Sequence, residues 1–263
     1  MQAQTIDEVI SQLAAIIHNS INSNSRAGYF AALYYKVTSR VKEGIAAGEF
    51  EDGDRMEQFD VLFANRYLTA YNHWTNKQPT TASWKIAFET LDKPTVLVLQ
   101  HLLLGMNAHI NLDLGIAVVE LAKSKRMPLE NLHNDFNLIN TILAALTYEV
   151  INELDKVSPL LSLAGLHSKN DSLLIQFAMS NARDGAWCFA EELHSKDDGQ
   201  YISCINQRDA GIYNLGKTIV EVKGFLKITL FIIYLFGYKN AAKIIRVLNT
   251  YKKTYLKVKS PTG

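Results

Sequence analysis

The stretch from Leu99 to Ile116 constrains the fold more than any other part of the chain, because it is apolar on almost every side of a helix yet carries several polar side chains. These polar residues are Gln100, His101, Asn107, His109, Asn111 and Asp113. A helix that is apolar all round belongs in the middle of a helical bundle. Polar groups on such a helix need partners, since an unpaired buried polar group costs kilocalories. The stretch therefore predicts a buried central helix, over about 94–123, with a polar site in the core.

The polar side chains fall on two separate arcs of this helix, at 100° per residue. The first arc consists of His101, Gly105, His109 and Asp113. The second arc consists of Gln100, Asn107 and Asn111. Both arcs can face one small pocket only if the helix is broken near Gly105. In an unbroken helix, the second arc is expected to tie neighbouring helices together.

Helical periodicity continues along the chain, and the period of two that is typical of strands is nearly absent. The expected helices cover 6–19, 26–47, 54–74, 83–88, 94–123, 129–154, 171–194 and about 200–255, with breaks at Gly224 and Gly237. No repeat or linker divides the chain, and its 263 residues fit within one domain. We predict an all-α, single-domain bundle (1–263) of about eight to ten helices around the central one.

Charge is divided unevenly between the body of the chain and its C-terminal part. Residues 223–263 carry nine of the 27 Lys and Arg side chains and none of the 26 acidic ones, which leaves the preceding part with a net charge of −8. The apolar run Phe225–Phe236 is too short to span a bilayer, because twelve helical residues cover about 18 Å of a roughly 30 Å core. We expect a buried apolar helix and then a solvated basic helix that pack on or flank the bundle. Peripheral contact with anionic lipid through 223–263 is the alternative.

The same charge pattern bears on partners and location. An acidic body opposes nucleic-acid binding, so no nucleic-acid partner is expected. The chain opens without a basic segment followed by an apolar stretch, which is not typical of a secretory signal. We therefore expect a cytoplasmic protein, membrane-peripheral if the lipid alternative holds, with a small-molecule or lipid substrate.

His109 and Asp113 form the centre of the predicted site, because residues four apart on a helix converge on one point. An imidazole and a carboxylate at this spacing suit a shared metal ion or a carboxylate that orients a general-base histidine. His101, two turns earlier on the same arc, is the third candidate ligand for a divalent metal such as zinc, iron or manganese. The competing interpretation is that these groups only satisfy one another in the core.

Residues from other helices are expected to complete the site. Asp135 and Asp184 would join His109 and Asp113 in the catalytic set. The predicted substrate-binding residues are Asn107, Asn111, Arg66, Tyr67, Arg183 and Trp187. Arg66 would bind an anionic group, and hydrolysis of a phosphoester or other ester is the reaction expected. The alternative is a non-catalytic helical protein that binds a ligand or a membrane and has a structural polar core.

The block His101-Leu-Leu-Leu-Gly-Met-Asn-Ala-His-Ile-Asn-Leu-Asp-Leu114 resembles the signature of an uncharacterised family of helical proteins from bacteria and fungi. The runs Trp84–Phe88, Asp135-Phe136 with Asn140, and Ala182–Trp187 are similar to other blocks of that family. The resemblance covers most of the chain. It implies a helical fold and marks these residues, and it brings no established activity with it.

A weaker similarity links the central helix to helical zinc phospholipase C and nuclease proteins. In that group a His-(x)3-Asp pattern lies beside a Gly-Asp-x-His motif. Here Gly105-Met-Asn-Ala-His109 has Met and Asn where the group has its Asp ligand. The N-terminal Trp ligand is also missing, because this chain begins with Met. These departures argue against a trinuclear zinc cluster and leave a site with one or two metal ions as the expectation.

Two further patterns carry less weight. Gly211–Thr218 matches the phosphate-loop pattern letter by letter, but no apolar strand precedes it, so we interpret the match as a coincidence. Asn134-Asp135 and Asn170-Asp171 match half of a terpene-cyclase metal motif. The companion acidic cluster is missing, which leaves a cyclase-like lyase as a minor alternative.

Overall fold

A computed structural model describes residues 2–154, 156–158, 160 and 179–249 of the chain. Regular secondary structure in these residues is helical throughout, and they contain no strand. The prediction of an all-α, single-domain fold with a buried central helix is confirmed. The predicted helix start at Asp171 and the basic end of the tail, from 250 onward, lie outside the described residues.

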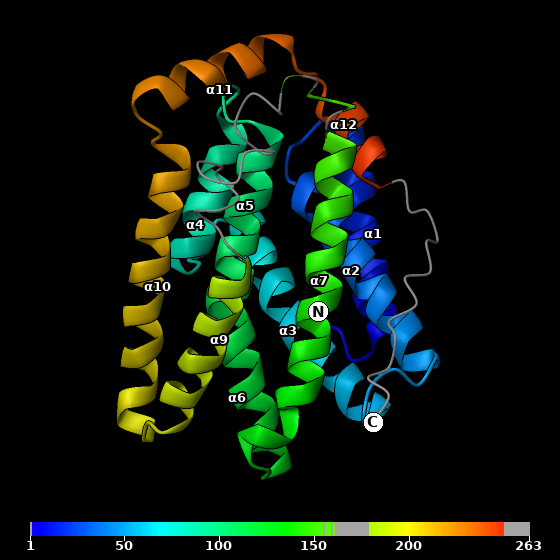
Figure 1. Cartoon of the computed structure of the whole chain (residues 1–263), viewed down its shortest axis with the longest axis vertical. Helices are drawn as coiled ribbons and strands as arrows, with labels where there is room; N and C mark the ends of the chain where they lie inside the picture. Colours follow the sequence, from blue (N-terminus) through cyan, green and yellow to red (C-terminus); the bar gives the residue numbers. More distant parts are fainter. Residues whose placement is uncertain (1, 155, 159, 161–178, 250–263) are drawn as a thin grey trace.

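The helices form an elongated bundle in which most long helices run along the same direction (Figure 1). Those before the middle of the chain are α1 (Ile6–Asn22), α2 (Gly28–Ala46), α3 (Gly53–Thr75), α4 (Ala82–Glu89), the 3₁₀ turn η1 (Thr90–Asp92), α5 (Val98–Ala108), the π-helical segment η2 (His109–Asp113) and α6 (Leu114–Lys125). Those after it are the 3₁₀ turn η3 (Leu129–Leu132), α7 (His133–Leu154), α9 (Met179–His194), α10 (Asp198–Val220), α11 (Gly224–Phe236) and α12 (Ala241–Leu248).

The central helix is continuous from α5 through η2 to α6 and runs along the middle of the bundle (Figure 1). Every residue from Val98 to Ala122 is buried except Glu120, which is half-buried. Helices α2, α4 and α10 pack against α5, while α3 and α9 pack against α6. The helix is apolar all round because neighbours cover it on all sides.

Among the described residues, one helix and one bent pair of helices meet the length and hydropathy expected of a membrane span. The central helix, Val98–Lys125, is one of them, but its apolar window is wholly buried inside the protein. The pair Lys227–Phe236 and Ala241–Leu248 qualifies only when taken together, and it is bent by 93°.

Two predicted helix starts differ from the observed ones. Helix α3 is capped by Asp52, whose side chain accepts the Arg55 amide, and not by Asp54. Pro94 does not lie in the first turn of the central helix, which begins at Val98. There the Gln100 side chain accepts the Leu97 amide at 3.0 Å and satisfies one of the free donors at the helix start.

The C-terminal helices differ from the expected buried apolar helix. Helix α12 is well covered, with Ile244, Ile245 and Leu248 buried against α1, α2 and α7. Helix α11 buries Ile233 but leaves Phe236 65% exposed. The apolar run of the sequence is therefore covered on one face only.

The segment that matches the phosphate-loop pattern lies within α10. A phosphate loop requires a strand that feeds an irregular turn, and a continuous helix provides neither. The interpretation of this match as a coincidence is confirmed by the helical backbone.

Gly105 is needed for the packing of the central helix against α2, so Gly105→Ala is expected to lower the free energy of unfolding by about 1–3 kcal/mol. A Cβ atom there would lie 2.4 Å from Cδ2 of Phe30. The Phe30 ring cannot move away freely, because it packs against the rings of Tyr67 and Trp84.

Urea unfolding followed by circular dichroism measures this effect, with Gly211→Ala as the matched control. Nothing lies within 4 Å of a Cβ atom at Gly211 in α10. The control is therefore expected to be neutral or to gain up to about 1 kcal/mol from better helix propensity. Equal stability of the two variants would contradict the packing role of Gly105.

Candidate functional site

The site is built around the His109–Asp113 pair in the π-helical segment of the central helix. Nδ1 of His109 lies 3.2 Å from Oδ2 of Asp113. An ionised carboxylate can only accept, so the imidazole must donate through Nδ1, and the neutral ring keeps its lone pair at Nε2. Segments of π-helix are rare and frequently occur at functional sites. The arrangement is that of a histidine oriented by a carboxylate.

Asp113 is deeply buried, and three side chains donate hydrogen bonds to its carboxylate. The Trp84 indole donates to Oδ2 at 2.8 Å, and Nε of Arg66 donates to Oδ1 at 2.9 Å. Burial alone would raise the pKa of this carboxyl, but the hydrogen bond from His109, the charge of Arg66 and the indole N–H together lower it. Three of the roughly four lone-pair sites of the Asp113 carboxylate are therefore engaged, which suits an orienting role better than that of a base.

The His109 ring lies in an aromatic surround. It stacks on Phe63 at 3.7 Å between centroids, with 7° between the ring planes, and meets the Tyr34 ring edge-on at 4.6 Å. Burial lowers the pKa of His109, and the opposing effect of Asp113 does not restore it. The imidazole is consequently neutral near pH 7.

Nε2 of His109 is buried and has no hydrogen-bond partner within the described part of the protein. The ring lines a small cavity of about 20 Å³, together with Phe30, Tyr34, Phe63 and Met106. A space of this size has the volume of about one water molecule, and apart from His109 and Tyr34 its lining is apolar. The free lone pair and the adjoining space give His109 the features of a general base.

A polar cleft of about 380 Å³ lies on the other side of the pair. Its polar lining includes Asn65, Arg66, His73, Thr81, Asp113 and Glu120. Nη1 of Arg66 donates to Glu120 at 3.3 Å, so this guanidinium lies between two carboxylates. Burial and the nearby Asp113 charge raise the pKa of Glu120, although Arg66 opposes this. Arg66 was expected to bind an anionic group, but its charge is already offset in the structure.

The second arc of the central helix binds α10. The Gln100 amide donates to the Ile219 carbonyl at 2.7 Å, and the Asn107 amide donates to the Ile212 carbonyl at 2.9 Å. The Asn111 amide in turn donates to the Asn107 side-chain oxygen. Asn107 and Asn111 were expected to position substrate, and their amides are instead used in joining α5 to α10.

The regular helix is interrupted at η2 and not at Gly105, where a break would have been needed for both arcs to face one pocket. The Leu114 amide there bonds to the His109 carbonyl, five residues back. Arg208 of α10 donates to the Asn111 carbonyl at 3.0 Å and to the Gly185 carbonyl of α9 at 3.1 Å. The two arcs still face different neighbours, so they do not share a pocket.

The expected three-ligand metal site is not formed. No group of three or more His, Cys, Asp or Glu side chains in the described ranges is placed to hold a metal ion. His101 packs against Tyr29 in a different part of the core, where burial and Arg26 lower its pKa to about 3. Both oxygens of Asp113 and Nδ1 of His109 are engaged, which leaves too few free donors for zinc, iron or manganese.

Asp135 does not join the pair. It accepts from Arg55 at 2.6 Å and from the Glu51 amide at 3.2 Å, near the start of α3. Arg55 and Arg66 are eleven residues apart on α3, or about 16 Å along its axis. Asp135 thus anchors α7 to α3. The terpene-cyclase alternative gains no support, because Asp135 is engaged in this way and Asn170-Asp171 lies outside the described residues.

Of the remaining predicted site residues, Asp184 and Trp187 are placed elsewhere, whereas Tyr67 lies beside the pair. Asp184 is exposed on α9. Trp187 stacks on His133 with 4.5 Å between the ring centroids, and this contact joins α9 to α7. Its indole N–H donates to Glu191 on the same helix. Tyr67 is buried in the aromatic cluster beneath the pair. The side chain of Arg183 lies outside the described part of the protein.

Sequence reasoning missed several residues that the structure places at or near the site. Trp84 was noted only as part of a resembling block, and Phe63 was not predicted to belong to the site. Tyr34, Thr38 and Asp60 are buried polar residues, each with a side-chain oxygen that has no hydrogen-bond partner in the described regions. Burial and the Glu57 charge raise the pKa of Asp60 to about 8. No pattern in the sequence marks Asp60, because a single Asp among apolar residues also occurs on solvated helix faces.

Comparison with known proteins places the chain in a family. A family described as a family of unknown function (DUF5995) matches residues 6–222. The match covers well over half of the chain, so the chain belongs to this family. The predicted membership of an uncharacterised family is confirmed. No curated protein and no solved structure matches the chain.

The Asp113 carboxylate is expected to be required for stability. Asp113→Asn should lower the free energy of unfolding by about 3 kcal/mol. The partly buried Arg66 loses one of its two carboxylate partners, and the NH₂ group of the new amide cannot accept the hydrogen bonds that a carboxylate oxygen accepts. Urea unfolding at pH 7 measures the change. Asp184→Asn is the control, since that side chain is exposed and should shift stability by less than about 0.5 kcal/mol. A similar result for both variants would contradict the role of Asp113.

Asp60 predicts a pH dependence of stability. The pKa of Asp60 is raised from 3.8 to about 8 on folding. The contribution of this group to the free energy of unfolding is therefore fully present below pH 3.8 and is lost as the pH rises toward 8. Asp60→Asn should remove this loss, at most about 1.4 kcal/mol per pH unit. Asp113 does not interfere, because its folded pKa is below 3.8 and it is ionised in both states above pH 5.

The measurement is urea unfolding of the wild type and Asp60→Asn at pH 5 and pH 8. We expect the variant to gain stability relative to the wild type between the two pH values. A difference between the proteins that does not change with pH would show that Asp60 does not titrate on unfolding in this range.

Proposed function

We propose that this member of the family is an enzyme in which His109 acts as a general base, oriented by Asp113, in the hydrolysis of an ester. The observation that carries the proposal is the free lone pair at Nε2 of His109, buried beside a cavity with room for one water molecule. Asp113 fixes the tautomer through Nδ1 and favours the imidazolium that forms when Nε2 takes a proton.

The proposed reaction requires an ester to reach Nε2 of His109, so the apolar side chains around the 20 Å³ space must move apart to admit it. A water molecule beside Nε2 transfers a proton to His109 as its oxygen attacks the carbonyl carbon or phosphorus of the substrate. The ester bond then breaks, and the imidazolium returns the proton to the departing alkoxide. Arg66 and Trp84 support this sequence through Asp113, which they hold in its ionised form. They are positioning residues in this scheme. The proposed proton transfers use only His109, a water molecule and the substrate.

The test compares His109→Gln with His18→Gln on two ester probes, p-nitrophenyl acetate and bis(p-nitrophenyl) phosphate. His18 is exposed on α1 and bonds to Asn22 on the same helix, so its loss should leave turnover unchanged. Loss of a general base should lower the rate by about 100-fold or more. The wild-type rate should stay high as the pH falls to 6.5, because the pKa of His109 is below that value.

Two results would count against the proposal. Equal rates for the His109 and His18 variants would exclude His109 as the base. Failure of the wild type to hydrolyse either probe would contradict ester hydrolysis. Circular dichroism of each variant checks that a lost rate does not reflect a lost fold.

A further inference from the structure

Helix α11 presents an apolar face to solvent. Of the large hydrophobic side chains that are exposed in the described residues, six lie between Ile228 and Tyr238, and the other two are Ile202 and Leu215 on α10. The exposed residues of α11 are Ile228, Phe231, Ile232, Leu235 and Phe236. Their spacing places them on one side of the helix, while Leu230 and Ile233 on the opposite side are buried. A contiguous exposed apolar face of this kind marks an interaction site.

The helix is placed so that this face is at one end of the molecule. Figure 1 shows α11 lying across the end of the bundle, transverse to the long helices, where it connects α10 to α12. Its thirteen residues span about 20 Å, less than the roughly 30 Å core of a bilayer. Since its other face is packed on the protein, the helix can lie at an interface but cannot cross a membrane.

The charged side chains from Lys223 onward are of one sign, whereas Glu221, just before α11, is exposed. Lys223 and Lys227 are exposed at the start of α11, and Lys239 and Lys243 follow it. No Asp or Glu occurs anywhere in 223–263, whereas the preceding part of the chain has a net charge of −8. An anionic surface would attract this end of the molecule and repel the rest, which orients the protein as it approaches.

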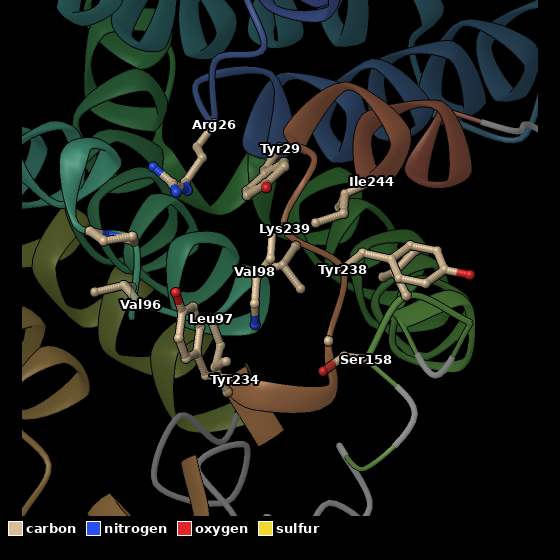
Figure 2. Close-up of a pocket in the computed structure, with 13 residues that line it drawn as sticks. Arg26, Tyr29, Val96, Leu97, Val98, Ser158, Tyr234, Tyr238, Lys239 and Ile244 are labelled. Carbon is tan, nitrogen blue, oxygen red and sulfur yellow. The ribbon is translucent and has the colours of Figure 1, made fainter. Parts of the chain in front are cut away.

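A small basic pocket lies at the junction between α11 and α12, beside Tyr234 and not among the exposed side chains of α11. The pocket measures about 100 Å³ and contains two cationic side chains, Arg26 and Lys239, with no Asp or Glu among the residues that line it. Figure 2 shows these two with Tyr29, Tyr234 and Ser158 around the same space, while the Tyr238 ring turns away from it. The Lys239 amine lies 3.5 Å from the centre of the Tyr234 ring. Such a pocket suits a phosphate group of a lipid at the membrane surface.

From these observations we infer that α11 and its junction with α12 dock on the surface of an anionic lipid bilayer. The exposed apolar side chains enter the interface, and the flanking lysines contact acidic headgroups. A second copy of this chain fits the surface less well, because two such ends would bring like charges together. This inference does not depend on the proposed activity, since docking requires neither His109 nor turnover.

The test is flotation of the full-length protein with vesicles of phosphatidylcholine containing 30 mol% phosphatidylserine, and with vesicles of phosphatidylcholine alone. The variant Phe231→Ser/Leu235→Ser removes two side chains of the α11 face that are 53% and 55% exposed. The variant Ile202→Ser/Leu215→Ser removes two exposed apolar side chains from α10 and is the matched control. A third variant, Lys223→Gln/Lys227→Gln, tests the charge. All these side chains are at the surface, so each variant should keep the fold.

We expect the wild type and the α10 control to bind the acidic vesicles equally. The ratio of bound to free protein should fall by about 100-fold in the α11 variant, about tenfold for each side chain. The same ratio should fall by about 25-fold in the lysine variant. Binding to vesicles of pure phosphatidylcholine should be weak for the wild type and for every variant.

Three outcomes would overturn the inference. The first is that the wild type does not float with acidic vesicles, and the second is that the α11 variant floats as well as the wild type. The third is that the wild type binds no vesicles and light scattering shows it to be a dimer, which only the α11 variant loses. The last outcome would assign the face to a second copy of the chain.

Discussion

The carboxylate of Asp113 lies in the most deeply buried helix of the protein, and the helices around it are placed so as to neutralise it. An ionised carboxyl in a core is tolerated only with charge and hydrogen-bond partners. Arg66 from α3 and Trp84 from α4 provide them, together with His109 one turn earlier on the same helix. These bonds require α3 and α4 to approach the central helix at one position. The polar site is therefore part of what defines the packing, whatever chemistry it performs.

The central helix contacts two separate polar neighbourhoods at and near its π-helical segment. His109 and Asp113 face the aromatic cluster and α3, while Asn107 and Asn111 bond toward α10. Arg208 reaches the backbone of the segment from α10 and connects it to α9. Apolar contacts between helices are non-directional, so it is these directional bonds that select one arrangement of the bundle.

The two proposals concern different parts of the molecule and complement each other. The general base is buried at the centre, and the lipid-docking face is at one end, across α11 (Figure 1). Each is supported by polar or apolar groups that the fold leaves unpartnered in the described residues: Nε2 of His109 in one case and the α11 side chains in the other. If both hold, the substrate class narrows to esters found in or near membranes.

Periodicity and composition alone determined the helical class, the buried central helix and the pairing of His109 with Asp113, because helical spacing brings residues four apart together in any helix. Only the tertiary structure decided which distant side chains reach them. Asp135 and Asp184 are as polar as Arg66 and lie on equally amphipathic helices, yet one is bonded to Arg55 and the other faces solvent. The packing of the helices also decided that one face of α11 is exposed to solvent. The reason is physical: local spacing fixes the direction of a side chain on its own helix, whereas the partner it meets depends on how the helices pack.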